Sequence, residues 1–298
     1  MTPTPDTAPT DYRAAGHVSF SVHIKPVMKS PYHSLHLQQH GSADTASRAY
    51  LNAGHCLALT PDRFGDEYAV CTMRRDKRTK AYQAFLAEAG DRKILTEAEA
   101  EKAAKVADVV RSHPRVAEAL AGDHLAEQLL TAVIPGLGPC GGRADLIWFD
   151  HATKTIWWID LKNWRTNDPR AVANDIARQA WDVQLAWYNR LGILSGIVPE
   201  RCADYDHRRV TLIACEGGSD DPITVGWHEH DVLMCAAGDG RLDKALDTIR
   251  ECKRTGEWPG EHVQSVVTPA KWATDDAGID LQTFFGVDIK AAPELDND

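Results

Sequence analysis

Two apolar runs separated by a short polar segment form the clearest hydrophobic pattern in the chain. The runs Gly142 to Phe149 and Thr155 to Lys162 are rich in β-branched and aromatic residues, and Asp150 to Lys154 between them is mostly polar. This spacing predicts a β-hairpin. Asp145 lies near the start of the first run and Asp160 near the end of the second. In an antiparallel hairpin these two carboxylates meet at one rim.

A lysine completes this group of charged residues. Lys162 follows Asp160 by two positions, so their side chains share one face of the strand. Mg²⁺ prefers hard oxygen ligands such as carboxylates, and a bound metal can activate water and neutralise charge on a phosphoryl oxygen. The ammonium can orient the attacking water or stabilise the transition state. The pattern alone also fits a surface hairpin with a solvated salt bridge.

Helical periodicity follows the hairpin. Apolar residues recur at spacings of three and four and predict one helix from about Arg170 to Leu191, which Gly192 ends. Gln184 and Tyr188 are i, i+4 neighbours on the flank of this stripe, so both can point toward the hairpin rim. They either contact DNA or a metal-bound water, or simply pack on the sheet.

The remaining pattern predicts further helices and strands around the hairpin. Thr96 and Glu99 form a capping box that begins a long helix. Together with the hairpin and its crossover helix, these elements predict an α/β fold with a central mixed β-sheet flanked by helices. The helices are expected at Arg48 to Leu59, Glu97 to about Arg111, Pro114 to Ala121 and Asp231 to Thr255, and the strands at Arg209 to Cys215 and Ile223 to His228.

Composition narrows the class of protein. The chain has 298 residues, with neither an apolar run of membrane-spanning length nor a signal-peptide pattern, so we expect a soluble, cytoplasmic protein without membrane partners. Its seven cysteines include no C-x-x-C pair. This spacing excludes a zinc ribbon and a four-cysteine iron–sulfur cluster, and we expect reduced thiols.

The net charge of −10 argues against a sequence-independent sheath of lysines around DNA. It does not exclude a nuclease, because a cleft depends on its local charge. One basic run is either a solvated loop or a DNA contact: Arg74, Arg75, Lys77, Arg78 and Lys80. A histidine-rich stretch lacks regular metal-ligand spacing: His17, His23, His33, His36 and His40.

The hairpin resembles the core of the PD-(D/E)xK nucleases. Asp145 corresponds to the first acid and Asp160-Leu161-Lys162 to the D-x-K, while Ala144 stands where the family name has proline. Gln184 to Tyr188 resembles the Q-x-x-x-Y signature of the RecB-like branch. Gly54 to Leu59, followed by Pro61, is similar to the histidine motif of the RecE (exonuclease VIII) nuclease domain.

Further segments are similar to the RecE-like family in the same order, from about Ser19 to about Ala273. These are Ser19 to Ser21, Ser30 to His33, Glu257 to Pro259 and Pro269 to Trp272. The resemblance therefore covers nearly the whole chain, and it implies that the histidine-rich stretch is a helical element near the DNA path. The nuclease domain that it implies spans residues 17–285, with a helical part 17–125 and a catalytic core 126–285. Composition adds a polar, proline-rich and therefore disordered tail (1–16) and an acidic tail (286–298).

The resemblance implies a restriction-endonuclease-like fold and a role for each site residue. Asp145, Asp160 and Lys162 would be catalytic, and Mg²⁺, replaceable by Mn²⁺, would be held by His55, Asp145, Asp160 and the Leu161 carbonyl. Gln184, Tyr188 and Arg143 would bind substrate. Glu127 is either an acid near the metal, as in related nucleases, or an exposed residue of a strand or helix. Neither zinc nor an iron–sulfur cluster is expected.

The implied activity is that of a phage or prophage exonuclease. It would hydrolyse phosphodiester bonds from double-stranded DNA ends, with 5′-to-3′ resection for recombination and repair beside a single-strand annealing protein. A homo-oligomeric ring is compatible with this. Two alternatives stay open: a single-strand-specific or CRISPR-type processing nuclease on the same fold, and a non-catalytic DNA-binding or anti-defence protein.

Overall fold

The computed structural model describes residues 15–41, 46–215 and 222–260. The chain divides into two units, Met1–Gly260 and Glu261–Asp298, and all of the described residues belong to the first. Nearly all of the predicted N-terminal tail, the segment Pro269 to Trp272 and the acidic tail lie outside the described residues. None of the described helices combines the length and the apolar character that crossing a membrane requires.

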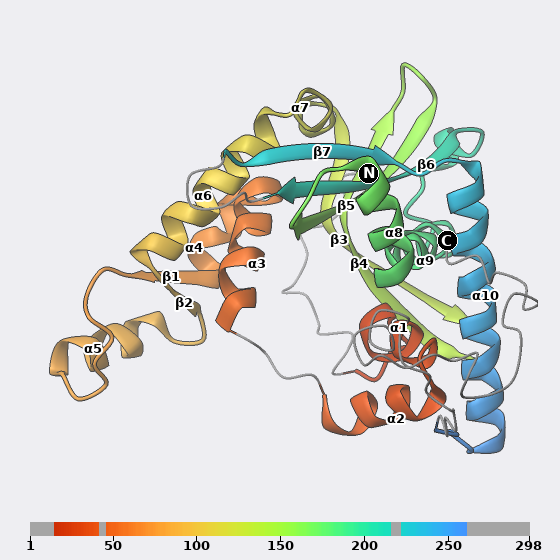
Figure 1. Ribbon diagram of the computed structural model, residues 1–298, viewed down its shortest axis with the longest axis horizontal. Coiled ribbons are helices and arrows are strands. Elements are labelled where there is room, and N and C mark those ends of the chain that lie inside the picture. Colours follow the sequence, from red (N-terminus) through yellow and green to blue (C-terminus); the bar gives the residue numbers. More distant parts are fainter. Residues whose placement is uncertain (1–14, 42–45, 216–221, 261–298) are drawn as a thin grey trace, which may run out of the picture. The chain divides into compact units, whose positions relative to one another are not determined.

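A five-stranded mixed sheet forms the centre of the unit, in the order β3-β4-β5-β6-β7 (Figure 1). Neighbouring strands are antiparallel except β5 and β6, which are parallel and therefore need a crossover. The predicted hairpin is confirmed as β4 and β5, and the two later strands as β6 and β7. The strands are β3 (Asp123–Ile134), β4 (Gly138–Asp150), β5 (Thr155–Trp164), β6 (Asp206–Cys215) and β7 (Thr224–Glu229).

Helices and a second, two-stranded parallel sheet surround the central one. The crossover consists of α8 (Pro169–Gln179) and α9 (Trp181–Leu194). The other elements are the π-helix η1 (Phe20–Ile24), α1 (Lys25–Val27), α2 (Pro31–His40), α3 (Ala46–Leu59), the 3-10 helix η2 (Pro61–Arg63), α4 (Phe64–Glu67), β1 (Tyr68–Cys71), α5 (Lys80–Ala89), β2 (Lys93–Thr96), α6 (Glu97–Ser112), α7 (Pro114–Ala121), the 3-10 helix η3 (Glu200–Cys202) and α10 (Val232–Thr255).

Local capping explains where two predicted helices begin. The Thr96 hydroxyl accepts a hydrogen bond from the Glu99 N–H at 3.2 Å, and the Glu99 carboxylate accepts one from the Thr96 N–H at 2.7 Å. This reciprocal pair confirms the capping box at the start of α6. At α10 the Asp231 carboxylate accepts from the Met234 N–H at 2.7 Å. Both helices therefore begin where the sequence predicts.

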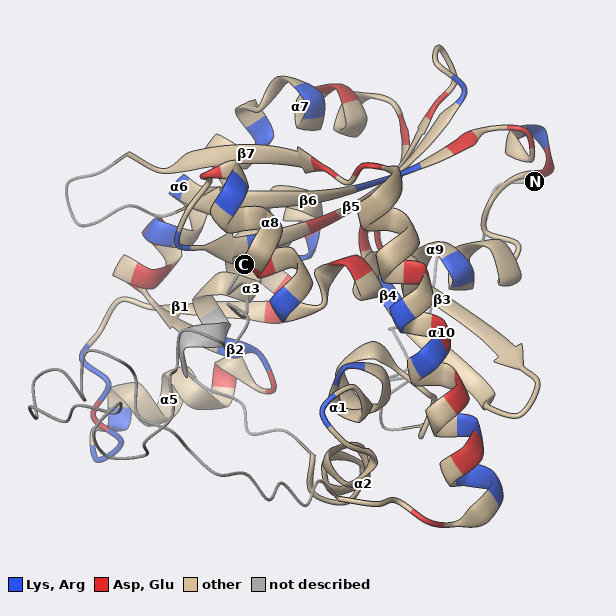
Figure 2. Ribbon diagram, turned by 45° about the vertical axis from the view of Figure 1, so that its right-hand side comes forward, with Lys and Arg blue, Asp and Glu red and all other residues tan. Residues whose placement is uncertain are grey.

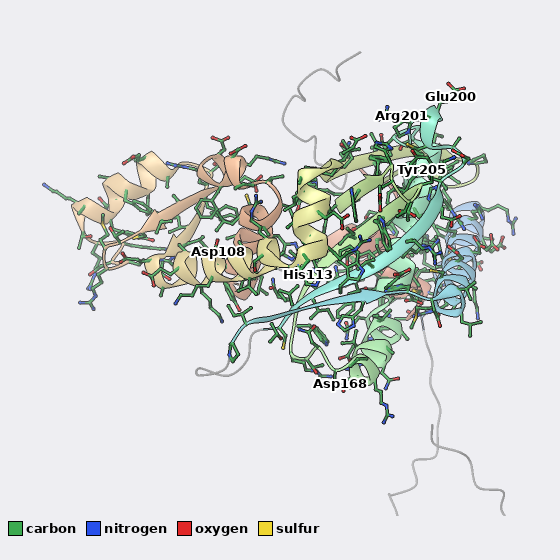
Figure 3. The ribbon with its side chains drawn as sticks, turned by 90° about the horizontal axis from the view of Figure 1, so that it is seen from above. Asp108, His113, Asp168, Glu200, Arg201 and Tyr205 are labelled. Atoms are coloured by element: carbon green, nitrogen blue, oxygen red, sulfur yellow. The ribbon has the colours of Figure 1, made fainter. Side chains whose placement is uncertain are left out.

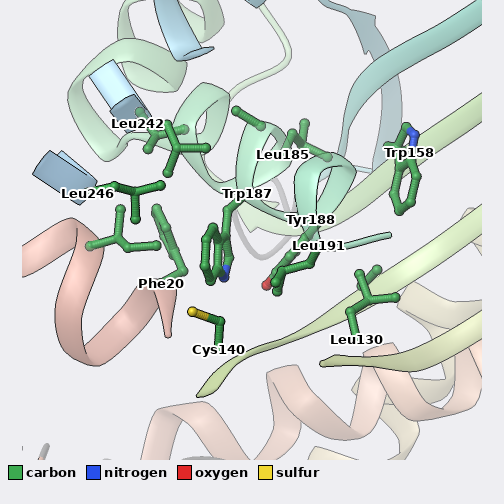
Figure 4. Packing of buried hydrophobic residues seen from close by; sticks show 14 of the residues in the cluster. Phe20, Leu130, Cys140, Trp158, Leu185, Trp187, Tyr188, Leu191, Leu242 and Leu246 are labelled. Atoms are coloured by element: carbon green, nitrogen blue, oxygen red, sulfur yellow. The ribbon is translucent and has the colours of Figure 1, made fainter. Parts of the chain in front are cut away.

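The sheet buries a separate apolar cluster on each face. Trp158 of β5 packs with Trp187 of α9 and Leu246 of α10 on one face (Figure 4). Trp157, its neighbour on β5, belongs to the cluster that α3, α6 and α7 cover on the other face. This alternation has the period of two expected of a strand with both faces buried. It places Asp160 on the same face as Trp158, toward α9.

The predicted helix from Arg170 to Leu191 is instead two helices. Ala180 adopts the left-handed conformation, with φ 60° and ψ 35°, which ends α8 and begins α9. The two parts of the apolar stripe pack against different neighbours. Ile176 of α8 packs with Ile213 in a small cluster, while Trp187 of α9 packs in the large one. A straight helix would not direct both parts of its stripe to these sites.

Gly192 does not end the helix, because α9 continues to Leu194. Instead it allows α9 to lie against β5, since a Cβ at position 192 would overlap the ring of Trp158. The glycine therefore marks a close approach of helix and sheet.

We expect Gly192→Ala to lower the free energy of unfolding by about 3 kcal/mol, because the new methyl group overpacks the core against Trp158. Gly240→Ala in α10 is the matched control, since a Cβ there meets open space, and it should raise stability by about 0.5–1 kcal/mol. Urea unfolding of both variants measures the difference. Equal stability of Gly192→Ala and the wild type would contradict the close-packing assignment.

Candidate active site

A polar cavity of about 510 Å³ lies at the rim of the central sheet, between strands β3 to β5, helices α3 and α9, and the small sheet. Two of the predicted site residues, Asp160 and Leu161, are buried behind its surface, with exposed fractions of 0% and 1%. The other predicted site residues line it: His55, Glu127, Arg143, Asp145, Lys162, Gln184 and Tyr188. The fold thus brings together residues that are spread over more than a hundred positions of sequence.

Strand register places the two predicted acids of the hairpin side by side. The pairing of β4 with β5 ends at Leu146 and Ile159, and Asp145 and Asp160 are the next residues on each strand. Beyond the last pair, the Leu161 N–H donates to Oδ2 of Asp145 at 2.8 Å. The two carboxylates therefore lie at one rim, as the hairpin predicted.

A third acid continues the same row. On β3, Ala126 pairs with Leu146 and Gln128 with Ala144, so Glu127 lies opposite Asp145 where the pairing skips one position. Glu127 has a φ of 50°, in the left-handed region. Such a conformation costs about 1–2 kcal/mol for a residue with a Cβ, and strain of this kind concentrates at functional sites.

His55, Glu127 and Asp145 form a group suited to a metal ion. One ligand atom from each of these residues lies within 4.8 Å of the other two. Nδ1 of His55 is 3.9 Å from Oδ2 of Asp145. One imidazole nitrogen and two carboxylate oxygens are ligands that divalent cations such as Mg²⁺ and Mn²⁺ accept. The donor set and its spacing fit a divalent ion at this position.

Asp160 is held by its neighbours on both oxygens. Nε2 of Gln184 donates to Oδ1 at 3.0 Å, and Nζ of Lys162 lies 2.6 Å from Oδ2. The same Gln184 amide nitrogen contacts the Tyr188 hydroxyl at 2.8 Å. The buried Asp160 carboxylate is therefore fixed between the Lys162 ammonium and the Gln184 amide.

The geometry therefore differs in part from the expected ligand set of His55, Asp145, Asp160 and the Leu161 carbonyl. The compact group includes Glu127, while Asp160 is engaged by Lys162 and Gln184. Leu161 contacts Asp145 through its N–H. The roles of these residues as ligands remain predictions.

Burial raises the pKa values of the three acids of the site. Burial raises the pKa of Glu127 to about 8, and the Asp145 carboxylate adds to the effect. Burial also raises the pKa of Asp145, against the influence of Lys162. The pKa of Asp160 rises to about 6, mainly by burial, although the Lys162 ammonium opposes this. A bound cation would relieve this repulsion, which supports the fit to a metal.

The pKa values of the two basic groups of the site, His55 and Lys162, are shifted in opposite directions. Burial lowers the pKa of His55 to about 4, and the nearby Lys162 acts in the same direction. Its imidazole is therefore neutral at pH 7, the form that binds metals. Burial also acts to lower the pKa of Lys162, but the carboxylates of Asp160 and Asp145 outweigh it and raise this pKa. Lys162 therefore stays charged.

Sequence reasoning missed one wall of the cavity. Tyr68 and Lys93 line it from β1 and β2, two strands that the pattern did not predict. Each strand has only four residues, which is too short for periodicity to reveal. The feature of the sequence that could have indicated this wall was the charge of Lys93.

Two other sequence patterns make local contacts in the described residues. The histidine-rich stretch is mainly helical from Phe20 onward, as the resemblance implied, while His17 precedes the first helix; none of these histidines belongs to a described metal-ligating group of three. His23 is buried and its Nδ1 accepts from the Ser19 N–H. In the basic run, Arg75 pairs with Glu99 and Arg78 with Asp76.

Comparison with known proteins gives little further information. No protein-family model matches the chain, and no curated protein matches it. Among solved structures it is similar to one named "putative exonuclease" from Eubacterium rectale, with a TM-score of 0.46 and 10% identity over 92% of this chain and 100% of that chain. A similarity at this level leaves the function to be inferred from the residues of the site.

We expect Glu127→Gln to stabilise the metal-free protein, and more at pH 9 than at pH 5. The folded protein keeps the Glu127 proton up to about pH 8, whereas the unfolded chain loses it near the ordinary glutamate pKa of 4.5. Stability therefore falls as the pH rises through this window, and the amide removes that loss. Thermal unfolding in a chelating buffer measures the effect. The control Glu101→Gln changes an exposed residue of α6. An equal gain at both pH values would contradict the assignment.

Proposed function

We propose that the chain is a metal-dependent deoxyribonuclease of the PD-(D/E)xK type. The row of Glu127, Asp145 and Asp160 across three strands carries this proposal, because Lys162 lies 2.6 Å from the last acid and His55 lies 3.9 Å from the middle one. This arrangement combines hard metal ligands with a fixed cation in a polar cavity. Metal-assisted phosphodiester hydrolysis uses that combination.

The metal would be held by His55, Glu127 and Asp145, with Asp160 and the Leu161 carbonyl as the further ligands that the resemblance implies. Mg²⁺ or Mn²⁺ would supply Lewis-acid stabilisation of the phosphoryl oxygens. The raised pKa values of the three acids mean that binding the ion displaces protons. We therefore expect metal affinity to rise with increasing pH between about 6 and 8.

Lys162 acts on the reacting phosphate and on the attacking water. Its ammonium is charged and fixed by Asp160, so it needs little reorganisation as negative charge develops. Gln184 holds Asp160 in turn, and its contact with Tyr188 fixes the amide. Gln184 and Tyr188 thus position the acid while facing the cavity, and Arg143 faces the same cavity as a cation for a substrate phosphate.

The finer assignment is an exonuclease that resects double-stranded DNA ends, 5′ to 3′, beside a single-strand annealing protein. It is supported by the ordered motifs of the RecE-like resemblance, from Ser19 through Gly54 to Leu59 and on to Gln184 and Tyr188. A ring of subunits around DNA would let a chain with a net charge of −10 stay on a polyanion, because enclosure replaces part of the ion pairing.

Digestion of a linear duplex labelled separately at each end tests the activity. With Mg²⁺ or Mn²⁺ the wild type should release label from an end, and Asp160→Ala should not. Asp160→Asn keeps the shape of this buried residue and guards against misfolding of the alanine variant. Cleavage of a closed circle would make the protein an endonuclease. Binding without cleavage of any DNA would favour the non-catalytic alternative.

Lys162→Ala should lower the single-turnover cleavage rate by about 10²–10³-fold or more, because it removes preorganised charge from the reacting phosphate. Metal and DNA binding should stay close to the wild type. Lys154→Ala, in the turn that precedes the same hairpin strand, is the matched control and should cleave normally. Loss of DNA binding together with cleavage would mean that Lys162 is a structural residue or a DNA anchor.

A further inference from the structure

The segment from Tyr68 to Thr96 forms an arm with its own charge. It consists of β1, a loop, α5 and β2, and the two strands pair in parallel. Its sequence contains seven Lys or Arg residues and three Asp or Glu residues, a net charge of +4 in a chain of −10. Helix α5 lies away from the central sheet (Figure 3). This arm therefore concentrates positive charge that the rest of the chain lacks.

The inner end of the arm is a wall of the candidate active site. Tyr68 and Lys93 are paired across β1 and β2, and both line the cavity. Nζ of Lys93 lies over the Tyr68 ring, 5.7 Å from its centroid, so a cation–π contact helps to position the ammonium. The acid on this wall, Glu67, is neutralised by Arg63 at 2.8 Å. Lys93 is thus a cation available to an anion in the cavity.

The outer part of the arm carries further exposed cations. Arg74, Lys77 and Lys80 are exposed and form no ion pair within the part of the chain that the structure describes. Figure 2 shows Lys and Arg gathered around the loop and helix α5. Residues 72 to 80 contain no aromatic side chain, whereas sites for single strands stack bases on aromatic rings. Cations without stacking platforms suit the phosphates of a duplex.

We propose that the arm is a DNA-backbone clamp that extends the active site. Lys93 contacts a phosphate at the cavity, and Arg74, Lys77 and Lys80 contact phosphates of the same duplex beyond it. The assignment of duplex DNA as the ligand rests on the proposed nuclease function. A local row of cations binds by displacing counterions from DNA, even on an acidic protein.

The salt dependence of DNA binding tests the clamp. The probe is a linear duplex of several helical turns, titrated in chelating buffer with wild type, Lys93→Ala, Lys93→Arg and Lys77→Ala/Lys80→Ala. Each lost phosphate contact should lower the slope of log Kd against log salt by about 0.9, so the double variant should lose about 1.8. Lys93→Arg should keep the wild-type slope, because it keeps the charge.

The matched control is Lys105→Ala/Lys244→Ala, which removes two exposed charges from α6 and α10 outside every described cavity. Its slope should equal that of the wild type. In cleavage assays, Lys77→Ala/Lys80→Ala should raise KM about tenfold at moderate salt, because two phosphate contacts are lost. The same variant should leave kcat within about twofold, because both lysines lie outside the cavity where the reaction takes place.

The two proposals fail in different ways. Wild-type slopes for Lys93→Ala and for Lys77→Ala/Lys80→Ala, with cleavage intact, would overturn the clamp and leave the nuclease standing. Slopes reduced as expected in a protein that never cleaves DNA would support the clamp and overturn the nuclease. A slope reduced equally by the Lys105→Ala/Lys244→Ala control would also overturn the clamp, because any lost charge would then have the same effect.

Discussion

Three carboxylates in one row across β3, β4 and β5, with Asp160 buried and Glu127 and Asp145 half-buried, are the constraint on which the rest of the site depends. Glu127, Asp145 and Asp160 repel one another, and burial raises all three pKa values. Lys162 offsets only part of this charge. The row persists because the sheet fixes it, through strand register and a left-handed residue at Glu127. Under the proposed function, a divalent cation would offset the repulsion that Lys162 leaves in this row.

Two helices beside the sheet add side chains to this row of carboxylates. α3 contributes His55 to the row, and α9 contributes Gln184 to its innermost acid. The distance between α9 and β5 is set by packing, because Gly192 lets the helix approach the ring of Trp158. Gln184 lies two turns earlier on the same helix. The packing of Gly192 against Trp158 therefore also sets the position of the Gln184 amide and its hydrogen bond to Asp160. The core and the chemistry are therefore coupled through one helix.

Local patterns predicted much of this arrangement from the sequence. The hairpin, the shared face of Asp160 and Lys162, and the i, i+4 pair Gln184 and Tyr188 follow from periods of 2 and 3.6. The left-handed break at Ala180 could not be predicted, because alanine normally favours helix and tertiary packing overrides it. The position of Glu127 depends on the register of β3, and the arm on a pairing of two short strands. Both are non-local contacts without a sequence signature.

Under the proposed function, the acidity of the chain is part of its specificity. A uniformly basic protein would hold DNA anywhere on its surface. Here Arg143 and Lys162 lie in the cavity, Lys93 lies on its wall, and Arg74, Lys77 and Lys80 continue along the arm, while the chain as a whole carries −10. A duplex would be attracted along one path and repelled elsewhere. A divalent ion at the proposed site would restore the positive charge that the carboxylate row removes from the reacting end of that path, and metal and DNA should then bind cooperatively.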